Sequence, residues 1–410
     1  MTRRDRLGLA GRATEQGTAV DHEDHADYAS RLAQTRQRIA DLGLDGLLIA
    51  SQYNRRYLTG LTATDHDITE SAGMALVTRG TFGLITSSFT LNGVEDEIKP
   101  SGAQPLLTDT DTGANVLARA LSDEGGVRRL GFEKYWMSYA TYARLRDALG
   151  EAVEFTPTDD IIELVRARKD PAELATIRRA ADIANRAFAQ LLHDIRIGMT
   201  EREIAALLER HMVALGADEP SFDTIVACGP GGAQPHWVPS DRAAQRGEPL
   251  LVDFGCRVDG YCSDLTRTVV IGEPDEKLRE IYDVVRRAQD AGLAALAAGA
   301  TRGREVDAAA RQVIDEAGYG KEFMHSLGHG VGLAVHELPA VSRLRVSTPE
   351  SEAELAKVEG IEPGVVITNE PGIYITGWGG VRLEDMIYVG ESGPEVLTDR
   401  NPQQIISIAG

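Results

Sequence analysis

Hydrophobic residues recur every three to four positions in several stretches of the chain, which is the spacing of a helix with one buried face. These stretches predict helices over 28–42, 113–121, 139–149, 171–195, 201–215, 275–298 and 304–317. Two of them also begin with a capping-box pattern, Asp170 with Glu173 and Thr200 with Glu203. Pro171 suits the first turn of the helix that Asp170 would cap.

Short apolar runs without helical spacing predict strands over 46–50, 74–77, 83–86, 129–132, 223–228, 365–370, 373–375 and 381–389. The stretch SQYNRRYLTGL, 51–61, is expected to be a loop. Alternating strands and helices over 28–165 predict an α/β domain with a mixed sheet. Helices and antiparallel strands over 171–410 predict an α+β domain.

One stretch places two carboxylates close together. Asp259-Gly260, between two apolar runs, is typical of a two-residue hairpin turn. With that turn, Val258 pairs with Tyr261 and Asp253 with Thr266. Asp253 and Asp264 are then diagonal neighbours on one face, roughly 7–8 Å apart at the backbone. Two ionised carboxylates at that distance repel each other, which favours a bound cation between them.

Length and charge exclude several classes of function. A chain of 410 residues is too long for one ordinary core, which predicts two domains. Its net charge of −20 argues against nucleic acid or an anionic membrane as partner. No stretch reaches the apolar length of a membrane span, and residues 1–27 lack the apolar core of a signal peptide and are expected to form a disordered tail.

Three cysteines, an odd number, match no zinc spacing and favour a reduced, cytoplasmic protein. Cys256 and Cys262 could face each other near the hairpin, although buried thiols are the favoured interpretation.

Three further residues extend the carboxylate pair. His329 lies among glycines, Glu370 ends an apolar strand, and Glu384 lies beyond the loop 376–380. If that loop closes a hairpin with Ile375 opposite Val381, Glu370 and Glu384 share one face, although Pro371-Gly372 is expected to disturb the register. Charges inside apolar strands are costly unless they are paired. Four carboxylates and one imidazole suit two divalent cations, and this oxygen-rich set favours Mn²⁺, with Co²⁺ or Fe²⁺ as alternatives, over Zn²⁺. Mg²⁺ fits less well because of the imidazole.

The motifs VDFGCRVDGYCSDLTRT, HSLGHGVGLAVHELP, VVITNEPGIYI and GGVRLEDM resemble those of the pita-bread metallopeptidases. The preceding domain, with IASQYNRRYLTGL, is similar to the creatinase-like N-terminal domain of the Xaa-Pro branch, which methionine aminopeptidases lack. The resemblance implies a pita-bread catalytic domain over 171–410. It also implies a homodimer, with Tyr53 to Arg56 as candidates to reach an active site across the dimer interface.

The resemblance also implies roles for individual residues. Asp253, Asp264, His329, Glu370 and Glu384 would bind two metal ions, with Asp264 and Glu384 as bridges. Arg382 would hold the bridging carboxylates from behind. His236, His325 and His336 would be active-site histidines, and Glu370 would also accept the proton of the water that the metals activate.

The implied activity is hydrolysis of the Xaa-Pro bond at peptide N-termini, as in an Xaa-Pro aminopeptidase. The alternative is an Xaa-Pro dipeptidase, or prolidase. Prolidase-type members carry an arginine just after the His-Glu-x-Pro run, where this chain has Ala340, with Arg343 nearby. Two weaker hypotheses are a hydrolase of another small amide such as ectoine and a catalytically dead binding protein. Both are weaker because the set of candidate metal ligands is complete.

Overall fold

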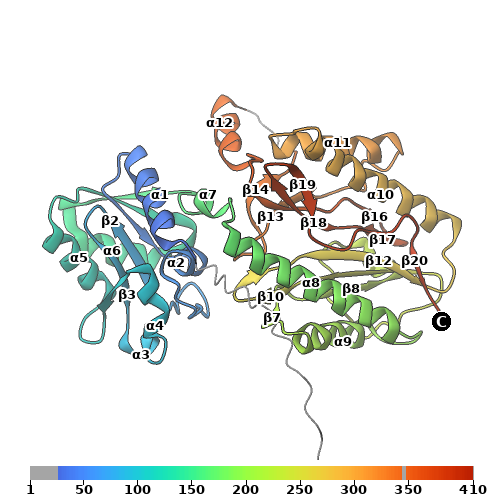
Figure 1. Cartoon of the computed structure of the whole chain (residues 1–410), viewed down its shortest axis with the longest axis horizontal. Coiled ribbons are helices and arrows are strands. Elements are labelled where there is room, and N and C mark those ends of the chain that lie inside the picture. Colours follow the sequence, from blue (N-terminus) through green and yellow to red (C-terminus); the bar gives the residue numbers. More distant parts are fainter. Residues whose placement is uncertain (1–25, 344–347, 410) are drawn as a thin grey trace, which may run out of the picture.

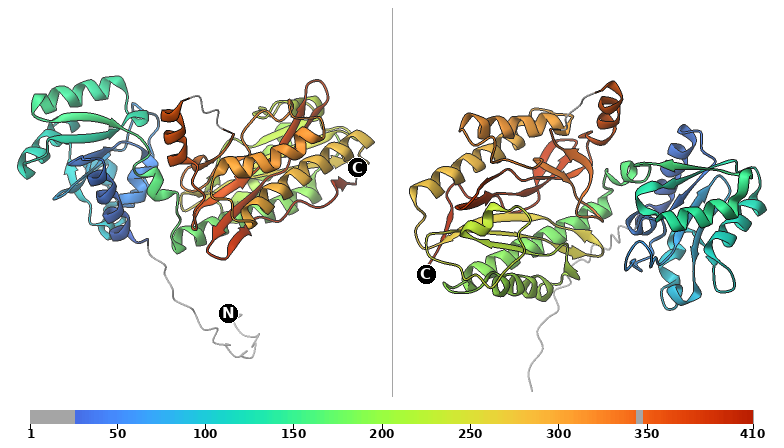
Figure 2. Two further views of the ribbon diagram at one scale, coloured as in Figure 1. Left: turned by 90° about the horizontal axis from the view of Figure 1, so that it is seen from above. Right: turned by 180° about the vertical axis from the view of Figure 1, so that it is seen from behind.

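The computed structural model describes residues 26–343 and 348–409. Over these ranges the chain folds into two bodies joined near residues 166–170 (Figure 1), and Figure 2 shows both bodies from two further directions. The predicted disordered tail lies outside the described residues except for Ala26 and Asp27, and Asp27 caps the first helix. No helix in the described part of the chain has the length and apolar character needed to cross a bilayer.

A six-stranded mixed sheet forms the centre of the N-terminal body, in the order β4-β3-β2-β1-β5-β6. Its strands are β1 (Gly46–Ile49), β2 (Met74–Thr78), β3 (Phe82–Thr86), β4 (Gln104–Leu107), β5 (Arg129–Glu133) and β6 (Glu154–Thr158). The sequence patterns missed β4 and β6. Both are edge strands that contain proline and carry exposed positions, so neither shows an apolar run.

Helices cover both faces of this sheet because its side chains alternate in direction. Leu47 and Ile49 pack in one cluster and Leu48 in another on the opposite face. The first cluster includes residues of α1 (Tyr28–Asp41), α2 (Gln52–Thr59) and α7 (Glu163–Arg166), and the second includes residues of α5 (Gly113–Glu124) and α6 (Tyr139–Leu149). Two short helices, α3 (Ser88–Leu91) and α4 (Glu95–Ile98), complete this body.

The loop expected over 51–61 was a wrong prediction, since most of it is α2. Ser51 caps this helix through its hydroxyl and Gly60 ends it in a left-handed conformation. Three of its buried residues, Asn54, Arg55 and Thr59, are polar. Arg55 forms an ion pair with Asp65 at 2.8 Å. Because three of the buried positions are polar, α2 shows no apolar periodicity.

Two larger sheets form the C-terminal body. One has the order β20-β12-β9-β8, the other β14-β13-β15-β18-β19. Their strands are β8 (Ile225–Cys228), β9 (Pro249–Phe254), β12 (Leu265–Ile271), β20 (Ile406–Ile408), β13 (Gly328–Gly330), β14 (Glu337–Val341), β15 (Val366–Asn369), β18 (Asp385–Gly390) and β19 (Gly393–Val396). Smaller sheets are formed by β7 (Glu219–Pro220), β10 (Cys256–Val258) and β11 (Tyr261–Cys262), and by β16 (Gly372–Ile375) and β17 (Gly379–Arg382).

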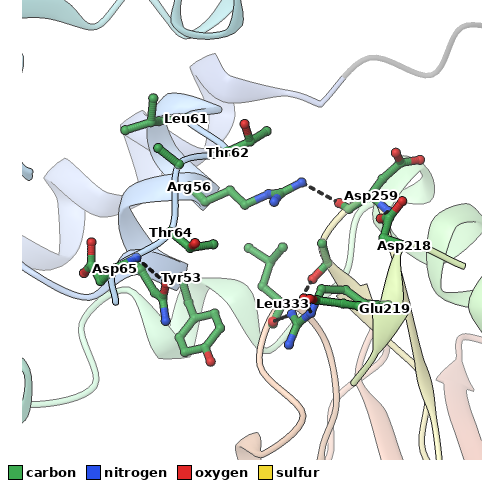
Figure 3. A pocket seen from close by; sticks show the side chains of 14 residues that line it. Tyr53, Arg56, Leu61, Thr62, Thr64, Asp65, Asp218, Glu219, Asp259 and Leu333 are labelled. Atoms are coloured by element: carbon green, nitrogen blue, oxygen red, sulfur yellow. Dashed lines mark hydrogen bonds and ion pairs between the residues drawn. The ribbon is translucent and has the colours of Figure 1, made fainter. Parts of the chain in front are cut away.

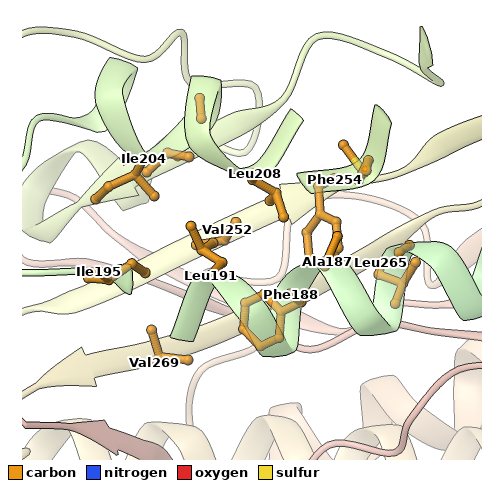
Figure 4. Close-up of a cluster of buried hydrophobic side chains, with 14 of the residues drawn as sticks. Ala187, Phe188, Leu191, Ile195, Ile204, Leu208, Val252, Phe254, Leu265 and Val269 are labelled. Carbon is orange, nitrogen blue, oxygen red and sulfur yellow. The ribbon is translucent and has the colours of Figure 1, made fainter. Parts of the chain in front are cut away.

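Helices lie outside these sheets in two pairs, so that strands fill the space between them (Figure 1). The pairs are α8 (Pro171–Asp194) with α9 (Glu201–Ala214), and α10 (Glu276–Ala297) with α11 (Gly303–Glu316), while α12 (Pro349–Val358) lies apart. Figure 4 shows the first pair packing on β9 and β12, with Phe188 stacked on Phe254 at 5.4 Å between ring centroids. The predicted helices and both capping boxes are confirmed.

Candidate metal centre

The first hairpin has the predicted register. Val258 pairs with Tyr261, and Asp253 pairs with Thr266. The turn residues Asp259 and Gly260 have φ of 47° and 84°, as a two-residue turn of this kind requires. This register puts the carboxylates of Asp253 and Asp264 on one face, and both residues are buried, at 8% and 5% exposure.

The second hairpin has a register two residues away from the predicted one. Ile375 pairs with Gly379 rather than Val381. A shift of two leaves every side chain on the same face, so the predicted common face of Glu370 and Glu384 is unaffected. The expected disturbance at Pro371-Gly372 was wrong: the pairs on either side, Asn369 with Asp385 and Gly372 with Arg382, belong to one continuous register. Glu370 and Glu384 therefore lie across from each other.

His329 completes the cluster from β13. Its Nε2 atom lies 3.4 Å from Glu370 Oε1 and 3.6 Å from Asp264 Oδ2. One ligand atom from each of Asp264, His329 and Glu384 falls within 4.8 Å of the others. The ring of His329 is oriented by its Nδ1 atom, 3.0 Å from the carbonyl oxygen of Gly330. The structure thus brings together all five residues that the sequence singled out as metal ligands.

The four carboxylates oppose one another electrostatically. Burial, and then the charges of neighbouring carboxylates, raise the pKa values of Asp264 and Glu384 well above their ordinary range. Burial also works to raise the pKa of Glu370, but a hydrogen bond from His329 and the nearby His325 outweigh it and bring this pKa to about 2. A cluster of this kind favours bound cations, because they would remove the repulsion.

Arg382 and Thr266 orient the carboxylates of the cluster through hydrogen bonds. Arg382 donates to Asp253 Oδ2 at 2.5 Å and to Thr266 Oγ1 at 2.9 Å, and the Thr266 hydroxyl donates to Glu384 Oε2 at 2.7 Å. The remaining oxygen of Asp253, Oδ1, is buried and has no hydrogen-bond partner in the described structure. This orphaned oxygen and the all-oxygen-and-imidazole donor set fit divalent metal ions.

The candidate histidines line a cavity of about 550 Å³ that also reaches all four carboxylates. His325 lies 2.7 Å from the Ser326 carbonyl through Nδ1 and 2.8 Å from the Tyr374 hydroxyl through Nε2. Because a carbonyl oxygen can only accept, Nδ1 of His325 carries the proton, and burial lowers the pKa of this histidine, which favours the neutral ring. Its Nε2 atom therefore accepts from the Tyr374 hydroxyl, and the Tyr374 oxygen accepts in turn from Arg382 at 2.8 Å.

His336 and His236 are more open to this cavity. The ring of His336 lies edge-on to that of His329, with 4.3 Å between centroids. Burial and the neighbouring His329 lower the pKa of His336 to about 4, so its imidazole is neutral at pH 7. His236 lies in the cavity wall beside Trp237, whose indole donates to Glu201 at 2.9 Å.

Sequence reasoning missed Thr266 and Tyr374. Both are common strand residues inside apolar strands, and nothing in their spacing distinguishes them from core residues. A signal was available only for Thr266, because the predicted register already placed it opposite Asp253.

A second cavity, of about 500 Å³, lies between the two bodies (Figure 3). Arg56 crosses it and donates to the Asp259 carbonyl at 2.8 Å, and Tyr53 lines it, but none of the clustered carboxylates does. Tyr53 and Arg56 thus lie at the junction within their own chain.

Comparison with known proteins agrees with this architecture. Residues 175–391 match the model of metallopeptidase family M24, and residues 31–168 match the creatinase/prolidase N-terminal domain. The chain belongs to metallopeptidase family M24. The M24 chain is therefore a metallo-exopeptidase with a creatinase-type N-terminal domain and a pita-bread C-terminal domain, and its family implies divalent metal ions.

Three relatives of this M24 enzyme cover much or nearly all of it. An Xaa-Pro dipeptidase of Pyrococcus furiosus is 43% identical over 60% of this chain and 67% of its own length. The structure of an Xaa-Pro dipeptidase from Bacillus anthracis matches with a TM-score of 0.81 at 35% identity, covering 93% of this chain and 99% of that one. An X-Pro aminopeptidase structure from Thermotoga maritima matches with a TM-score of 0.76 at 34% identity, covering 91% and 100%.

Proposed function

We propose that this enzyme hydrolyses the Xaa-Pro bond at the N-terminus of peptides. The observation that carries the proposal is the convergence of four carboxylates and His329 on one wall of a cavity that three further histidines also line. Relatives named as Xaa-Pro dipeptidases and as an X-Pro aminopeptidase support it. A free peptide amine would meet this carboxylate-rich wall, which suits an exopeptidase.

In this proposal Asp253, Asp264, His329, Glu370 and Glu384 would hold two divalent cations. Mn²⁺ is the first candidate, Co²⁺ and Fe²⁺ follow, and Zn²⁺ is disfavoured by the oxygen-rich donor set. When bound, such cations would lower the pKa of a water molecule and polarise the scissile carbonyl.

The surrounding residues supply proton transfer and hydrogen bonds. The hydrogen bond from His329 and the nearby His325 keep Glu370 ionised, and in this proposal it accepts the proton of the attacking water and passes it to the proline nitrogen. His236 and His336 each donate an N–H to the carbonyl oxygen as negative charge develops on it, and loss of one such donor costs about 10²–10³ in turnover. His325, fixed by Tyr374, lines the pocket for the proline ring.

The preferred peptide length separates two versions of this function. Ala340 stands where prolidase-type members carry an arginine, and Arg343 is not among the residues that line the cavity, which favours an aminopeptidase acting on longer peptides. The names of the relatives support a dipeptidase equally well. Initial rates on Ala-Pro and Ala-Pro-Ala decide between them: faster cleavage of the tripeptide supports the aminopeptidase, and a strong preference for the dipeptide supports the prolidase.

The site assignment has a direct test. Asp264→Ala or Glu384→Ala should abolish metal-dependent hydrolysis, and full activity in either variant contradicts the assignment. Ectoine and creatine are tested separately as alternative substrates. Cleavage of either one without cleavage of Xaa-Pro peptides would show that the enzyme hydrolyses another small amide.

We also propose a cytoplasmic homodimer with its domain boundary between residues 165 and 171. Three free, buried cysteines are consistent with a reducing compartment, and the creatinase-type domain supports dimerisation. Light scattering after gel filtration tests the oligomeric state, and a monomer at micromolar concentration would contradict this part of the proposal.

A further inference from the structure

A buried ionic cluster lies at the junction of the two bodies, outside the carboxylate site. The carboxylate of Glu337 binds the guanidinium of Arg166 and, at 2.6 Å, the ammonium of Lys169. All three side chains are at most 5% exposed. Removing one partner from such a buried group leaves another charge unpaired, which is strongly unfavourable.

This cluster continues into the N-terminal domain. Arg166 donates at 2.6 Å to the side-chain oxygen of Asn54, and the Asn54 amide donates at 2.6 Å to both Glu133 and Glu163. Glu133 also accepts the backbone N–H groups of residues 50 and 51, at the end of β1. A continuous network of hydrogen bonds and ion pairs therefore connects Glu337 to the end of β1 in the N-terminal sheet.

The residue directly before Glu337 faces the candidate active site. This residue, His336, lines the cavity of the carboxylate cluster and lies against the ring of His329. The Glu337 carboxylate, by contrast, is held in the junction, and it also accepts the backbone N–H of Ala334 at 3.3 Å. A Cβ atom at Gly332 would lie only 2.3 Å from Glu337 Oε1, so the glycine leaves the space that this carboxylate occupies.

We propose that Glu337 is a positioning residue for His336. Its carboxylate, held by Arg166 and Lys169, fixes the turn 334–337 and thereby the direction of the His336 imidazole. The inference rests on the proposed function in one respect, namely that His336 donates a hydrogen bond during hydrolysis. It also makes the N-terminal domain part of the catalytic apparatus within one chain, through the network that ends at Glu337.

A double-mutant cycle tests this relationship in the Mn²⁺-loaded, full-length enzyme. Glu337→Gln should lower kcat at least tenfold with little change in KM, because His336 acts on charge that develops in the transition state. In a His336→Ala background the same substitution should change kcat less than threefold. A Glu337→Gln enzyme within twofold of wild type, or an undiminished loss in the His336→Ala background, would overturn the proposal.

A matched control is available in the same junction. Glu173 is also buried, lies 3.6 Å from Arg31 of the N-terminal domain, and has no hydrogen bond to the 334–337 turn. Glu173→Gln should therefore leave kcat within threefold, whereas an equal loss would show that any damaged junction lowers activity. If Glu337→Gln does not fold, Lys169→Met removes one of the two cations and should give the same pattern at a smaller size, while unchanged kcat in that variant counts against the proposal.

Crystal structures of wild type and Glu337→Gln separate this inference from the proposed function. A displaced His336 imidazole with the carboxylate cluster unchanged supports positioning even if no Xaa-Pro peptide is cleaved. An unmoved imidazole refutes it even if wild type is a fully active Xaa-Pro peptidase.

Discussion

Arg382 donates to one oxygen of Asp253 at 2.5 Å and leaves the other oxygen, which is buried, free to bind a metal. The same guanidinium contacts Thr266 and Tyr374, so it orients the cluster and also balances part of its charge. Two properties of Arg382, its charge and its forked shape, can be separated by substitution.

Arg382→Lys keeps the charge but not the fork, and we expect kcat to fall about tenfold or more with metal content retained. Arg382→Gln also removes the charge, and we expect it to lower the free energy of unfolding by about 3–5 kcal/mol, as for other broken buried pairs. Urea denaturation measures the free energy of unfolding of each variant and of the wild type. Arg400→Gln, which breaks an exposed pair with Asp290, should change stability by less than about 1 kcal/mol.

Asp264→Asn and Glu384→Gln should stabilise the metal-free protein while they abolish its stabilisation by Mn²⁺. Each substitution removes one member of a mutually repelling, buried set, and we expect an increase on the order of 1 kcal/mol. Thermal unfolding with EDTA and with Mn²⁺ tests both effects. Asp385→Asn is the control, because Asp385 is paired with Arg267 at 3.0 Å and its loss should destabilise the metal-free protein. A metal-free Asp264→Asn protein less stable than wild type would count against the repulsion.

Metal removal should make stability depend on pH. Asp264 and Glu384 have raised pKa values in the folded protein. Their contribution to the stability of the metal-free protein is therefore fully present below about pH 4 and is lost as pH rises through those raised values. Glu370, with its pKa lowered to about 2, acts in the opposite direction, and only at acid pH. We therefore expect the Tm of the metal-free protein to fall, relative to that of the Mn²⁺-loaded protein, as pH rises from about 5 to 8. A constant Tm difference over this range would contradict the expectation.

Tyr374→Phe should lower kcat about tenfold, because it removes the hydroxyl shared by His325 and Arg382 and leaves both partners short of a hydrogen bond. Steady-state kinetics on an Xaa-Pro tripeptide measure the effect. Tyr282→Phe also removes a buried hydroxyl, which donates to the Pro402 carbonyl at 3.1 Å, but Tyr282 does not line the cavity of the carboxylate cluster, so kcat should stay within twofold. Equal losses in the two variants would assign the effect of Tyr374 to general destabilisation.

The period-two geometry of strands explains why the carboxylate face was predictable. The turn Asp259-Gly260 fixed the first register correctly, and the second prediction was two residues off without moving Glu370 or Glu384 to another face. Local pattern failed where tertiary contacts decide the structure. Several buried residues of α2 are polar, and Asn54 among them binds partners far along the chain. The strands β4 and β6 are held as edge strands by their neighbours.

The hydrogen-bond partners inside the site were not predictable for the same reason. Thr266 and Tyr374 resemble ordinary strand residues in the sequence. Glu337 forms its ion pairs with Arg166 and Lys169 at the junction of the two bodies. Such contacts depend on the packing of whole elements, which spacing along the chain does not encode.

The most direct measurement is a Mn²⁺ titration of metal-free enzyme, with product release from Ala-Pro and Ala-Pro-Ala followed at each step. We predict that activity on at least one of these peptides rises up to two equivalents of Mn²⁺ per chain, and that Asp264→Ala shows none. Cleavage at the same rate in EDTA, or no cleavage of either peptide when both metal equivalents are bound, would contradict the proposed two-metal Xaa-Pro peptidase.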